Sequence, residues 1–344
     1  MPEFRQNLAT REWVIIARES SLKPEDFTPP LRGPQDPIPH RRSDCPFCPG
    51  NEAATPTSVF TLSTNDHWSL RVVPNKFAAL SEAQDHTAIN EGCFLKAGGY
   101  GIAEVVIETP RHDLTIASME DSEVARIVQA YKTRALSMEA KPDIRLVTIF
   151  RNYGPLAGTS IEHPHSQLIA TPIVPPHVDD PIQKAREYFR DNKHCVFCAI
   201  LEEELSQSVR ILDQNEHFVA FCPFASHTPF ETRIYPKRHA PSFTLISEDE
   251  VTAFARILQR TMARIHLCLG VPNYNYLIRS APAGNGDADE YHWYFVVLPR
   301  ITTPAGFEIG TGIFVNSVPP EMAAAYLRDC DPEAARFQRK GNPY

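Results

Sequence analysis

The clearest helical pattern in the chain lies between residues 247 and 270. Apolar side chains recur there at intervals of three and four residues, at Val251, Phe254, Ala255, Leu258, Met262 and Ile265. This spacing places them on one face of an α-helix. Ser247 and Glu250 have the spacing of a capping box, and Gly270 can adopt the left-handed conformation that ends a helix. The pattern predicts one amphipathic helix with a defined start and end.

A second helix is expected after Ser118, where Asp121 would supply the carboxylate of a similar cap. Short apolar runs around the two helices predict β-strands. They are residues 68–73, 104–112 and 145–150 around the first helix, and residues 217–221, 231–239 and 274–279 around the second. Each set continues, after a loop with glycine, into a strand carrying His163 or His292. Because the runs are short and linked by turns, we expect antiparallel sheets.

The order of these features repeats along the chain. Each copy begins with a Cys-x-x-Cys pair, at Cys45 and at Cys195, and the two pairs lie 150 residues apart. The histidines that follow are separated by 51 residues in the first copy and by 53 in the second. We therefore predict two tandem copies of one α+β unit, residues 1–180 and residues 181–344.

Composition limits the class of protein. The 344 residues carry 34 Lys and Arg against 42 Asp and Glu, a formal net charge of −8. This balance argues against a protein that coats nucleic acid or binds a membrane surface. The first twenty residues lack the apolar stretch of a secretory signal, and no stretch reaches the ~20 apolar residues of a membrane span. We expect a cytoplasmic protein, with an extended surface segment at residues 24–44.

Cysteines in a reducing compartment are more often metal ligands or buried thiols than disulfides. The chain has eight cysteines, and we assign the four outside the two pairs to the core: Cys93, Cys222, Cys268 and Cys330.

Each Cys-x-x-Cys pair can bind one Zn²⁺ together with two histidines from elsewhere in its copy. The first predicted site is Cys45, Cys48, His112 and His163, and the second is Cys195, Cys198, His239 and His292. Four protein ligands leave no open position, so both sites would be structural. Metal-free buried thiols are the alternative, and His194, His217 or His227 could replace a ligand of the second site.

Residues 152–167, NYGPLAGTSIEHPHSQ, carry the most specific chemical signal. In an extended chain His163, His165 and Gln167 fall on one face. The preceding Gly/Pro loop lets backbone N–H groups approach a phosphate. A neutral imidazole is a good nucleophile toward phosphorus, and an adjacent amide can stabilise the phosphoryl oxygens. If His163 binds metal while His165 attacks a substrate, Pro164 or local twist must separate their targets.

His163-Pro-His165-Ser-Gln167 resembles the signature of the histidine-triad superfamily, in its galactose-1-phosphate uridylyltransferase branch. The resemblance extends over nearly the whole chain. It includes Trp13-Val-Ile15, Cys45–Cys48, Arg71–Phe77, Glu108–His112, Asn152–Gln167, Tyr291–Tyr294 and Ala305–Gly312. It implies an α+β fold of two tandem histidine-triad-like domains with antiparallel sheets and flanking helices. It also implies a homodimer whose sites are shared between subunits.

By this resemblance His165 attacks the α-phosphorus of a nucleotide sugar, sugar 1-phosphate leaves, and a second phosphate accepts the nucleotidyl group. Gln167 and Ser160 would contact the phosphoryl group, and Asn152 would help to bind it. The resemblance further places Asn75 and Phe77 in the nucleoside pocket and Glu308 near the hexose. Tyr294 stands where the second copy would need its nucleophilic histidine, so one chemical site per chain is expected.

The main prediction is a transfer of the UDP-glucose–hexose-1-phosphate uridylyltransferase type, but the resemblance leaves the base of the nucleotide and the phosphate acceptor open. Enzymes dedicated to galactose 1-phosphate usually have glycine where this chain has Ser166, which is more like the ADP-glucose phosphorylase-like members. Those members transfer AMP to inorganic phosphate. Of a family phosphate-binding run only Lys23 is present, and Arg151, Lys76, Arg279 and Arg300 are alternative cations. A nucleotide hydrolase and a catalytically silent nucleotide-sugar-binding protein are the other hypotheses.

Overall fold

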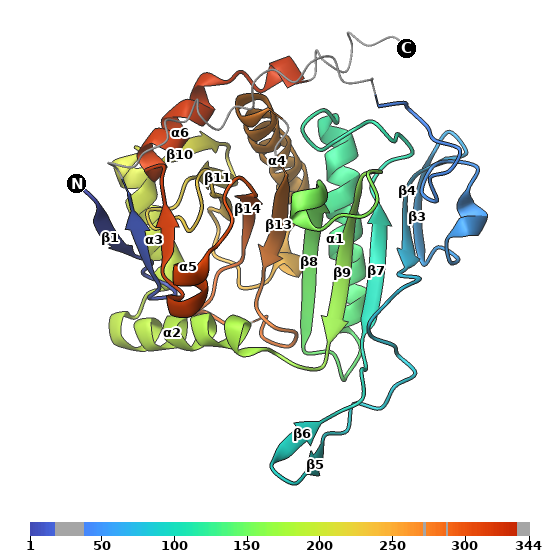
Figure 1. Cartoon of the computed structure of the whole chain (residues 1–344), viewed down its shortest axis with the longest axis horizontal. Helices are drawn as coiled ribbons and strands as arrows, with labels where there is room; N and C mark the ends of the chain where they lie inside the picture. The colour runs from blue at the N-terminus through green and yellow to red at the C-terminus, as the bar shows by residue number, and fades with distance from the viewer. Residues whose placement is uncertain (18–37, 271–272, 287, 336–344) are drawn as a thin grey trace.

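The computed structural model describes residues 1–17, 38–270, 273–286 and 288–335. Its centre is a ten-stranded sheet in which every neighbouring pair is antiparallel (Figure 1). From one edge to the other the strands are β10 (Ile211–Gln214), β11 (Phe218–Phe221), β12 (Thr232–Pro236), β14 (Tyr294–Pro299), β13 (Tyr274–Arg279), β8 (Leu146–Tyr153), β9 (His165–Thr171), β7 (Ile102–Ile107), β4 (His67–Pro74) and β3 (Phe60–Thr64). The predicted α+β class with antiparallel pairing is confirmed.

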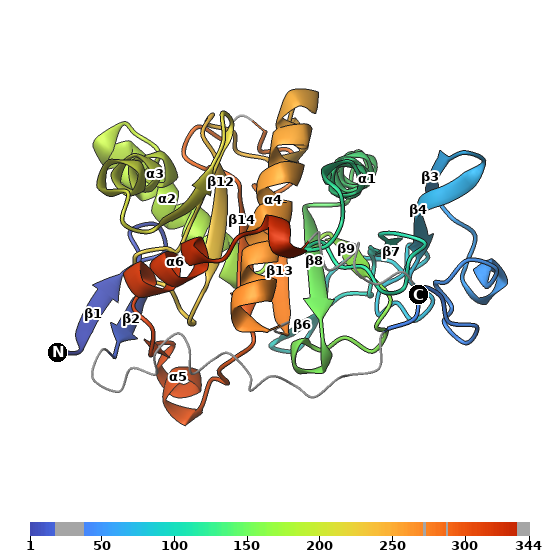
Figure 2. The same ribbon diagram turned by 90° about the horizontal axis from the view of Figure 1, so that it is seen from above.

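The sheet consists of two five-stranded halves that have the same order of strands when each is followed outward from the centre. The central pair is β8 with β13, and Ile149 lies opposite Ile278. Helices α1 (Asp121–Glu139) and α4 (Glu248–Leu269) pack on the same face of the sheet (Figure 2). The sequence suggested the repeat, but it did not indicate that both copies share one continuous sheet.

Alternation along the strands separates the core from the site. On β9, Leu168 and Ala170 are buried in the cluster that α1 and α4 cover, while His165 and Gln167 point to the other face. In the second half that other face is packed by α2 (Pro176–Asn192) and α3 (Val196–Gln207). In the first half it is packed by the loop that carries the first Cys pair. The open part of this face is where the candidate site lies.

The ends of the two core helices test the capping predictions. For α4 they are confirmed, because the Ser247 hydroxyl accepts from the Glu250 N–H at 3.2 Å and Gly270 has φ of 63°. For α1 the predicted cap is wrong. The N-cap is Glu120, whose N–H donates to the Glu123 carboxylate at 2.8 Å. The Ser118 hydroxyl instead bonds the backbone of Thr115, so it is not available as a cap.

The smaller elements complete the fold. They are β1 (Glu3–Gln6), β2 (Trp13–Ile16), the β5 (Ile89–Glu91) and β6 (Phe94–Lys96) hairpin, α5 (Gly306–Thr311), β15 (Phe314–Asn316), α6 (Pro320–Asp329) and single 3-10 turns at Glu52–Ala54, Pro155–Ala157 and Phe243–Leu245. Strand β2 pairs with β15, so the first strands of the chain lie against its C-terminal part. Residue 180 lies within α2, and the predicted division there stays a prediction.

The cysteines outside the pairs differ from expectation. Cys222 is buried, as predicted, but Cys93 is exposed at the turn of the β5–β6 hairpin. Cys268 and Cys330 form a disulfide with their Cα atoms 6.1 Å apart. The assignment to the core was wrong for Cys93. It is confirmed for Cys268, which is buried in the main core cluster with Cys330 packed against that cluster. The disulfide between these two was not expected, because a pattern of single residues does not show that the end of α4 lies beside the end of α6.

Of the expected surface segment at residues 24–44, residues 38–44 are exposed. The remainder, like Lys23, lies outside the described residues. No helix in the described part of the chain is both long and apolar enough to cross a membrane.

Candidate functional site

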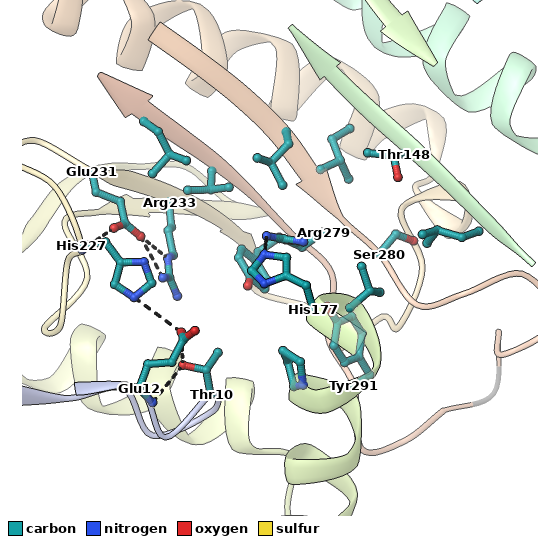
Figure 3. A pocket seen from close by; sticks show the side chains of 18 of the residues that line it. Thr10, Glu12, Thr148, His177, His227, Glu231, Arg233, Arg279, Ser280 and Tyr291 are labelled. Atoms are coloured by element: carbon teal, nitrogen blue, oxygen red, sulfur yellow. Dashed lines mark hydrogen bonds and ion pairs between the residues drawn. The ribbon is translucent and has the colours of Figure 1, made fainter. Parts of the chain in front are cut away.

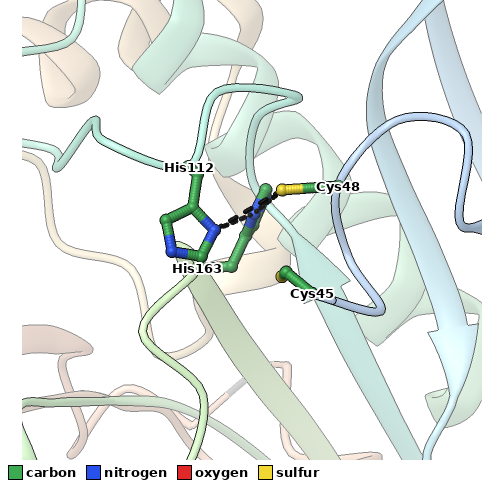
Figure 4. Close-up of side chains that lie close together, drawn as sticks. All are labelled: Cys45, Cys48, His112 and His163. Atoms are coloured by element: carbon green, nitrogen blue, oxygen red, sulfur yellow. Dashed lines mark hydrogen bonds between the residues drawn. The ribbon is translucent and has the colours of Figure 1, made fainter. Parts of the chain in front are cut away.

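The first predicted metal-binding group assembles as expected (Figure 4). Cys45, Cys48, His112 and His163 are all buried, and one ligand atom of each lies within 4.8 Å of the others. The Cys48 Sγ is 3.5 Å from the Nδ1 atoms of both histidines, which are 3.3 Å from each other. The His163 Nε2 bonds the Thr109 carbonyl at 2.8 Å, which leaves Nδ1 as the ligand atom. This group could hold a metal ion.

The second group is less regular. Cys195, Cys198 and His239 gather within 4.8 Å, and the Nδ1 of His292 lies 3.4 Å from the Cys198 Sγ. The three histidines considered as replacements are not part of this group: His194 is paired with Glu202 and His227 with Glu12, and His217 is also outside it. The four predicted residues therefore remain the candidate ligands.

His165 begins β9, and its ring is held by the backbone. Its Nδ1 donates to the His163 carbonyl at 2.8 Å. Because a carbonyl oxygen only accepts, Nδ1 carries the proton and Nε2 keeps its lone pair. Burial lowers the pKa of His165, which favours the neutral imidazole. This is the protonation state that a nucleophile requires.

The prediction that His163 lies on the same strand as His165 was wrong, although both rings pack against Phe47 and line the same cavity. The strand begins at His165, and His163 lies before it with Pro164 between them. The His163 ring is therefore free to turn into the metal-binding group, while His165 and Gln167 alternate with the buried Ser166 and Leu168. The two neighbouring histidines can serve different partners without competing.

A cavity of about 580 Å³ opens beside His165. Asn152, Ser160 and His163, all expected at the site, line it with His165. The loop between β8 and β9 forms one wall. Gly154 in this loop has φ of 83°, and a Cβ there would lie 2.1 Å from the Asn273 Oδ1. Only glycine fits this turn.

The second half of the chain supports the same loop. The Asn273 Oδ1 accepts from the Leu156 N–H at 3.1 Å. The Asn275 amide donates to the Asn152 Oδ1 at 2.8 Å and to the Ala157 carbonyl at 3.0 Å. Asn273 and Asn275, which the sequence did not indicate, therefore fix the loop and one of the expected binding residues.

Three expected binding residues do not line this cavity. The Asn75 N–H donates to the carbonyl of Ala103 on β7. Ile107, which pairs with His165, lies four residues further along β7, a distance of ~13 Å at ~3.3 Å per residue. Phe77 follows Asn75 and its side chain is 87% exposed. Glu308 lies on α5, where it accepts from the Ala305 N–H at 2.9 Å.

A buried polar network beneath β9 was missed by the sequence analysis. Arg151 forms an ion pair with Glu108, and both side chains are almost fully buried. The Tyr131 hydroxyl bonds the Ser166 hydroxyl and the Tyr276 hydroxyl at 2.6 Å each. Arg151 also lines the cavity beside His165. The sequence did offer one signal for this network, because Glu108 and Arg151 are opposite charges that lie next to or within apolar runs predicted to form strands.

In this fold a histidine whose ring is held by the His163 carbonyl lines a cavity on the open face of the sheet. The family model described as galactose-1-phosphate uridyl transferase, N-terminal domain, matches residues 2–175. A domain of unknown function matches residues 117–329. The chain belongs to the galactose-1-phosphate uridylyltransferase family, and the nucleotidyltransferase class predicted from the sequence is confirmed.

The relatives include both expected activities. ADP-glucose phosphorylase of Arabidopsis thaliana is 33% identical over 95% of this chain and 93% of its own length. Galactose-1-phosphate uridylyltransferase of Thermotoga maritima is 27% identical over 97% of this chain and 100% of its own. The crystal structure of the Arabidopsis ADP-glucose phosphorylase with bound ADP-glucose superposes with a TM-score of 0.81 and 30% identity, covering 96% of this chain and 99% of that one.

Proposed function

We propose that this enzyme moves a nucleoside monophosphate from a nucleoside diphosphate sugar to a phosphate acceptor through a covalent nucleotidyl-His165. The Nε2 lone pair of His165 attacks the α-phosphorus, and the bond from that phosphorus to the bridging oxygen breaks. Sugar 1-phosphate leaves with the electron pair. An oxygen of the acceptor phosphate then attacks the same phosphorus and releases His165. The observation that carries the proposal is the Nδ1–H bond to the His163 carbonyl, which leaves the Nε2 lone pair available on a ring that lines the cavity.

The remaining predicted residues fit an extended nucleotide on this face of the sheet. Ser160 and Asn152 line the same cavity as His165 and would contact the phosphoryl group, and Gln167 follows on the same face of β9. Asn75 and Phe77 lie ~13 Å along the sheet from His165, a separation that suits the nucleoside end of the donor.

We favour ADP-glucose as the donor and inorganic phosphate as the acceptor. The 33% identity to a relative named ADP-glucose phosphorylase supports this assignment. Ser166 supports it too, because a serine at this place resembles the ADP-glucose phosphorylase-like members; its hydroxyl accepts a hydrogen bond from the Tyr131 hydroxyl. UDP-glucose with a hexose 1-phosphate acceptor is the second candidate, supported by the relatives named uridylyltransferase.

We further propose that both Cys/His groups bind Zn²⁺ as structural sites. A zinc tetrahedron with Zn–N of ~2.0–2.1 Å and Zn–S of ~2.3 Å has N···N edges of ~3.3 Å and S···N edges of ~3.6 Å. The 3.3 Å and 3.5 Å separations in the first group agree with these edges.

The cytoplasmic location expected from the sequence stays a prediction. The disulfide between Cys268 and Cys330 weighs against a strongly reducing compartment.

The test is an intact mass under neutral conditions, because a phosphoramidate is labile in acid. The protein is incubated separately with ADP-glucose and with UDP-glucose. We expect an AMP adduct with ADP-glucose, and a UMP adduct alone would select the second candidate. His165→Ala should lose both the adduct and the exchange of labelled glucose 1-phosphate into the donor, whereas His86→Ala, at an exposed histidine outside the cavity, should retain them.

Exchange that persists in His165→Ala would disprove the covalent mechanism. Linear release of free AMP without an acceptor would instead identify a hydrolase.

A further inference from the structure

A second cavity, of about 290 Å³, lies on the same face of the sheet in the C-terminal half (Figure 3). Its walls come from β13, β14, the first turn of α2, the segment before β2 and the segment that enters β12. None of its lining residues lines the cavity beside His165. The reaction proposed for His165 therefore gives it no role.

The internal repeat relates the two cavities. His163 and His292 hold equivalent places beside the cysteine pairs, and Ile149 pairs with Ile278. Both separations are 129 residues. The same offset relates His165 to Tyr294, which lines the second cavity. The second cavity is thus the counterpart of the catalytic one, with a phenol in place of the nucleophilic imidazole.

One end of the second cavity suits an anion. The Arg279 guanidinium donates to the His177 Nε2 at 3.0 Å, and in the described part of the chain no carboxylate lies within ion-pairing distance of it. His177 lies in the first turn of α2, whose dipole favours negative charge. The Ser280 hydroxyl is bonded to Phe243 and Ser242, so Arg279 is the main anion-binding group of this end. A guanidinium without a carboxylate partner matches a phosphate group.

The other end suits hydroxyl groups. The Glu12 carboxylate accepts from the Thr10 hydroxyl at 2.7 Å and lies 3.5 Å from the His227 Nε2. Glu231 is bonded to the Arg233 guanidinium at 2.9 and 2.8 Å. Both carboxylates are balanced by a partner, and each retains lone pairs that can accept hydrogen bonds from a ligand. In Figure 3, Arg279 and Glu12 stand on different sides of the opening.

We propose that this cavity binds a sugar phosphate without covalent chemistry, its phosphate at Arg279 and its hydroxyls toward Glu12. The apolar side chains of Leu277, Val296 and Leu298 also line the cavity and can pack against the ring. The volume is near the lower end of the ~300–1,000 Å³ of small-molecule sites, which suits a hexose phosphate and is too small for a whole nucleoside diphosphate sugar. The proposal does not depend on which nucleotide His165 accepts.

The test is calorimetric titration of the whole protein with glucose 6-phosphate, glucose and inorganic phosphate. We expect glucose 6-phosphate to bind most tightly, and Arg279→Gln to weaken its binding at least tenfold. Arg190→Gln, which changes an exposed arginine of the same helix α2 as His177, should bind it like the unchanged protein. Asn152→Ala, in the His165 cavity, should also leave this binding unchanged.

Val178→Trp, which fills the cavity from the first turn of α2, is the second variant and should weaken binding to the same degree. Undiminished binding in both Arg279→Gln and Val178→Trp, or no binding of glucose 6-phosphate to the unchanged protein, would overturn the proposal. Binding of inorganic phosphate as tight as that of glucose 6-phosphate would also overturn the proposal. The end of the cavity with Glu12 and Glu231 would then add nothing to the binding of the sugar. Since the nucleotidyl adduct is measured separately, failure of the proposed reaction and failure of this site are distinguishable.

Discussion

Arg151 places a full positive charge beside the His165 cavity although its side chain is only 1% exposed. Burial opposes the charge, but the Glu108 carboxylate outweighs that effect and raises the pKa of Arg151 above its usual value. Glu108 also accepts from the hydroxyls of Tyr131 and Tyr276, and Tyr131 reaches Ser166 next to His165. The network thus connects a charged wall of the cavity to the strand that carries His165, the proposed nucleophile.

Replacing Arg151 by methionine should destabilise the protein strongly. The change leaves the Glu108 carboxylate buried without a counter-charge, and breaking a buried pair from one side costs about 3–5 kcal/mol. Urea unfolding measures the effect. Lys132→Met, which removes the exposed ion pair to Glu248, is the control and should change the free energy of unfolding by less than ~1 kcal/mol. If Arg151→Met lowers the free energy of unfolding by less than ~1 kcal/mol, water reaches Glu108 and the network is not sealed from solvent.

At the scale of elements, local sequence patterns predicted the bounds of a helix or strand best where those bounds depend on residues of that element alone. The α4 start and end follow from Ser247, Glu250 and Gly270, and β13 has the predicted bounds. The α1 start was missed because Ser118 bonds Thr115, a choice between two local partners that spacing does not settle. The β8–β13 pairing was missed for a different reason, because strand order depends on contacts between distant segments.

The site shows the same division. Motif spacing predicted all four members of the first Cys/His group and three that gather in the second, while His292 lies beside the Cys198 thiol. It did not predict Asn273 and Asn275, which support the loop beside His165 from the other half of the chain. These two residues reach the loop only because β13 is the neighbour of β8. The sequence of the first half alone therefore could not predict them.

The two Cys/His groups join residues of loops to residues near strand ends. The number of metal ions that they bind can be measured directly. We expect two zinc ions per chain by inductively coupled plasma mass spectrometry. Cys48→Ser and Cys198→Ser should each reduce the content to one, because a serine hydroxyl is a much poorer zinc ligand than a thiolate. Cys93→Ser, at an exposed cysteine of the hairpin, should retain both ions. Zinc content unaffected by Cys198→Ser would show that the second group is a cluster of metal-free thiols.

At the scale of the whole molecule, α5 is the element whose place the proposed reaction does not explain within one chain. Glu308 was expected near the hexose, but α5 belongs to the C-terminal part and does not line the His165 cavity. No side chain of α5 is buried, and Phe307 and Ile309 are 49% and 77% exposed. Exposed apolar residues on a short helix favour contact with another protein surface. A homodimer in which α5 completes the partner's cavity accounts for both observations.

This arrangement predicts that two inactive variants restore each other. Consider a mixed dimer of one His165→Ala chain and one Glu308→Ala chain, with sites shared between the subunits. One of its two sites combines the intact His165 of the second chain with the intact Glu308 of the first. Equal mixing with free subunit exchange should then restore about a quarter of the unmutated activity, because half of the dimers are mixed and each has one complete site. The measurement is exchange of labelled glucose 1-phosphate before and after mixing, with dimers confirmed by analytical ultracentrifugation. A mixture of His165→Ala with Phe77→Ala is the control. Phe77 and His165 belong to the same half of one chain, so each site of a mixed dimer keeps one defect and mixing should restore no activity. If mixing restores nothing with Glu308→Ala although mixed dimers form, Glu308 acts within its own chain and the shared site is wrong.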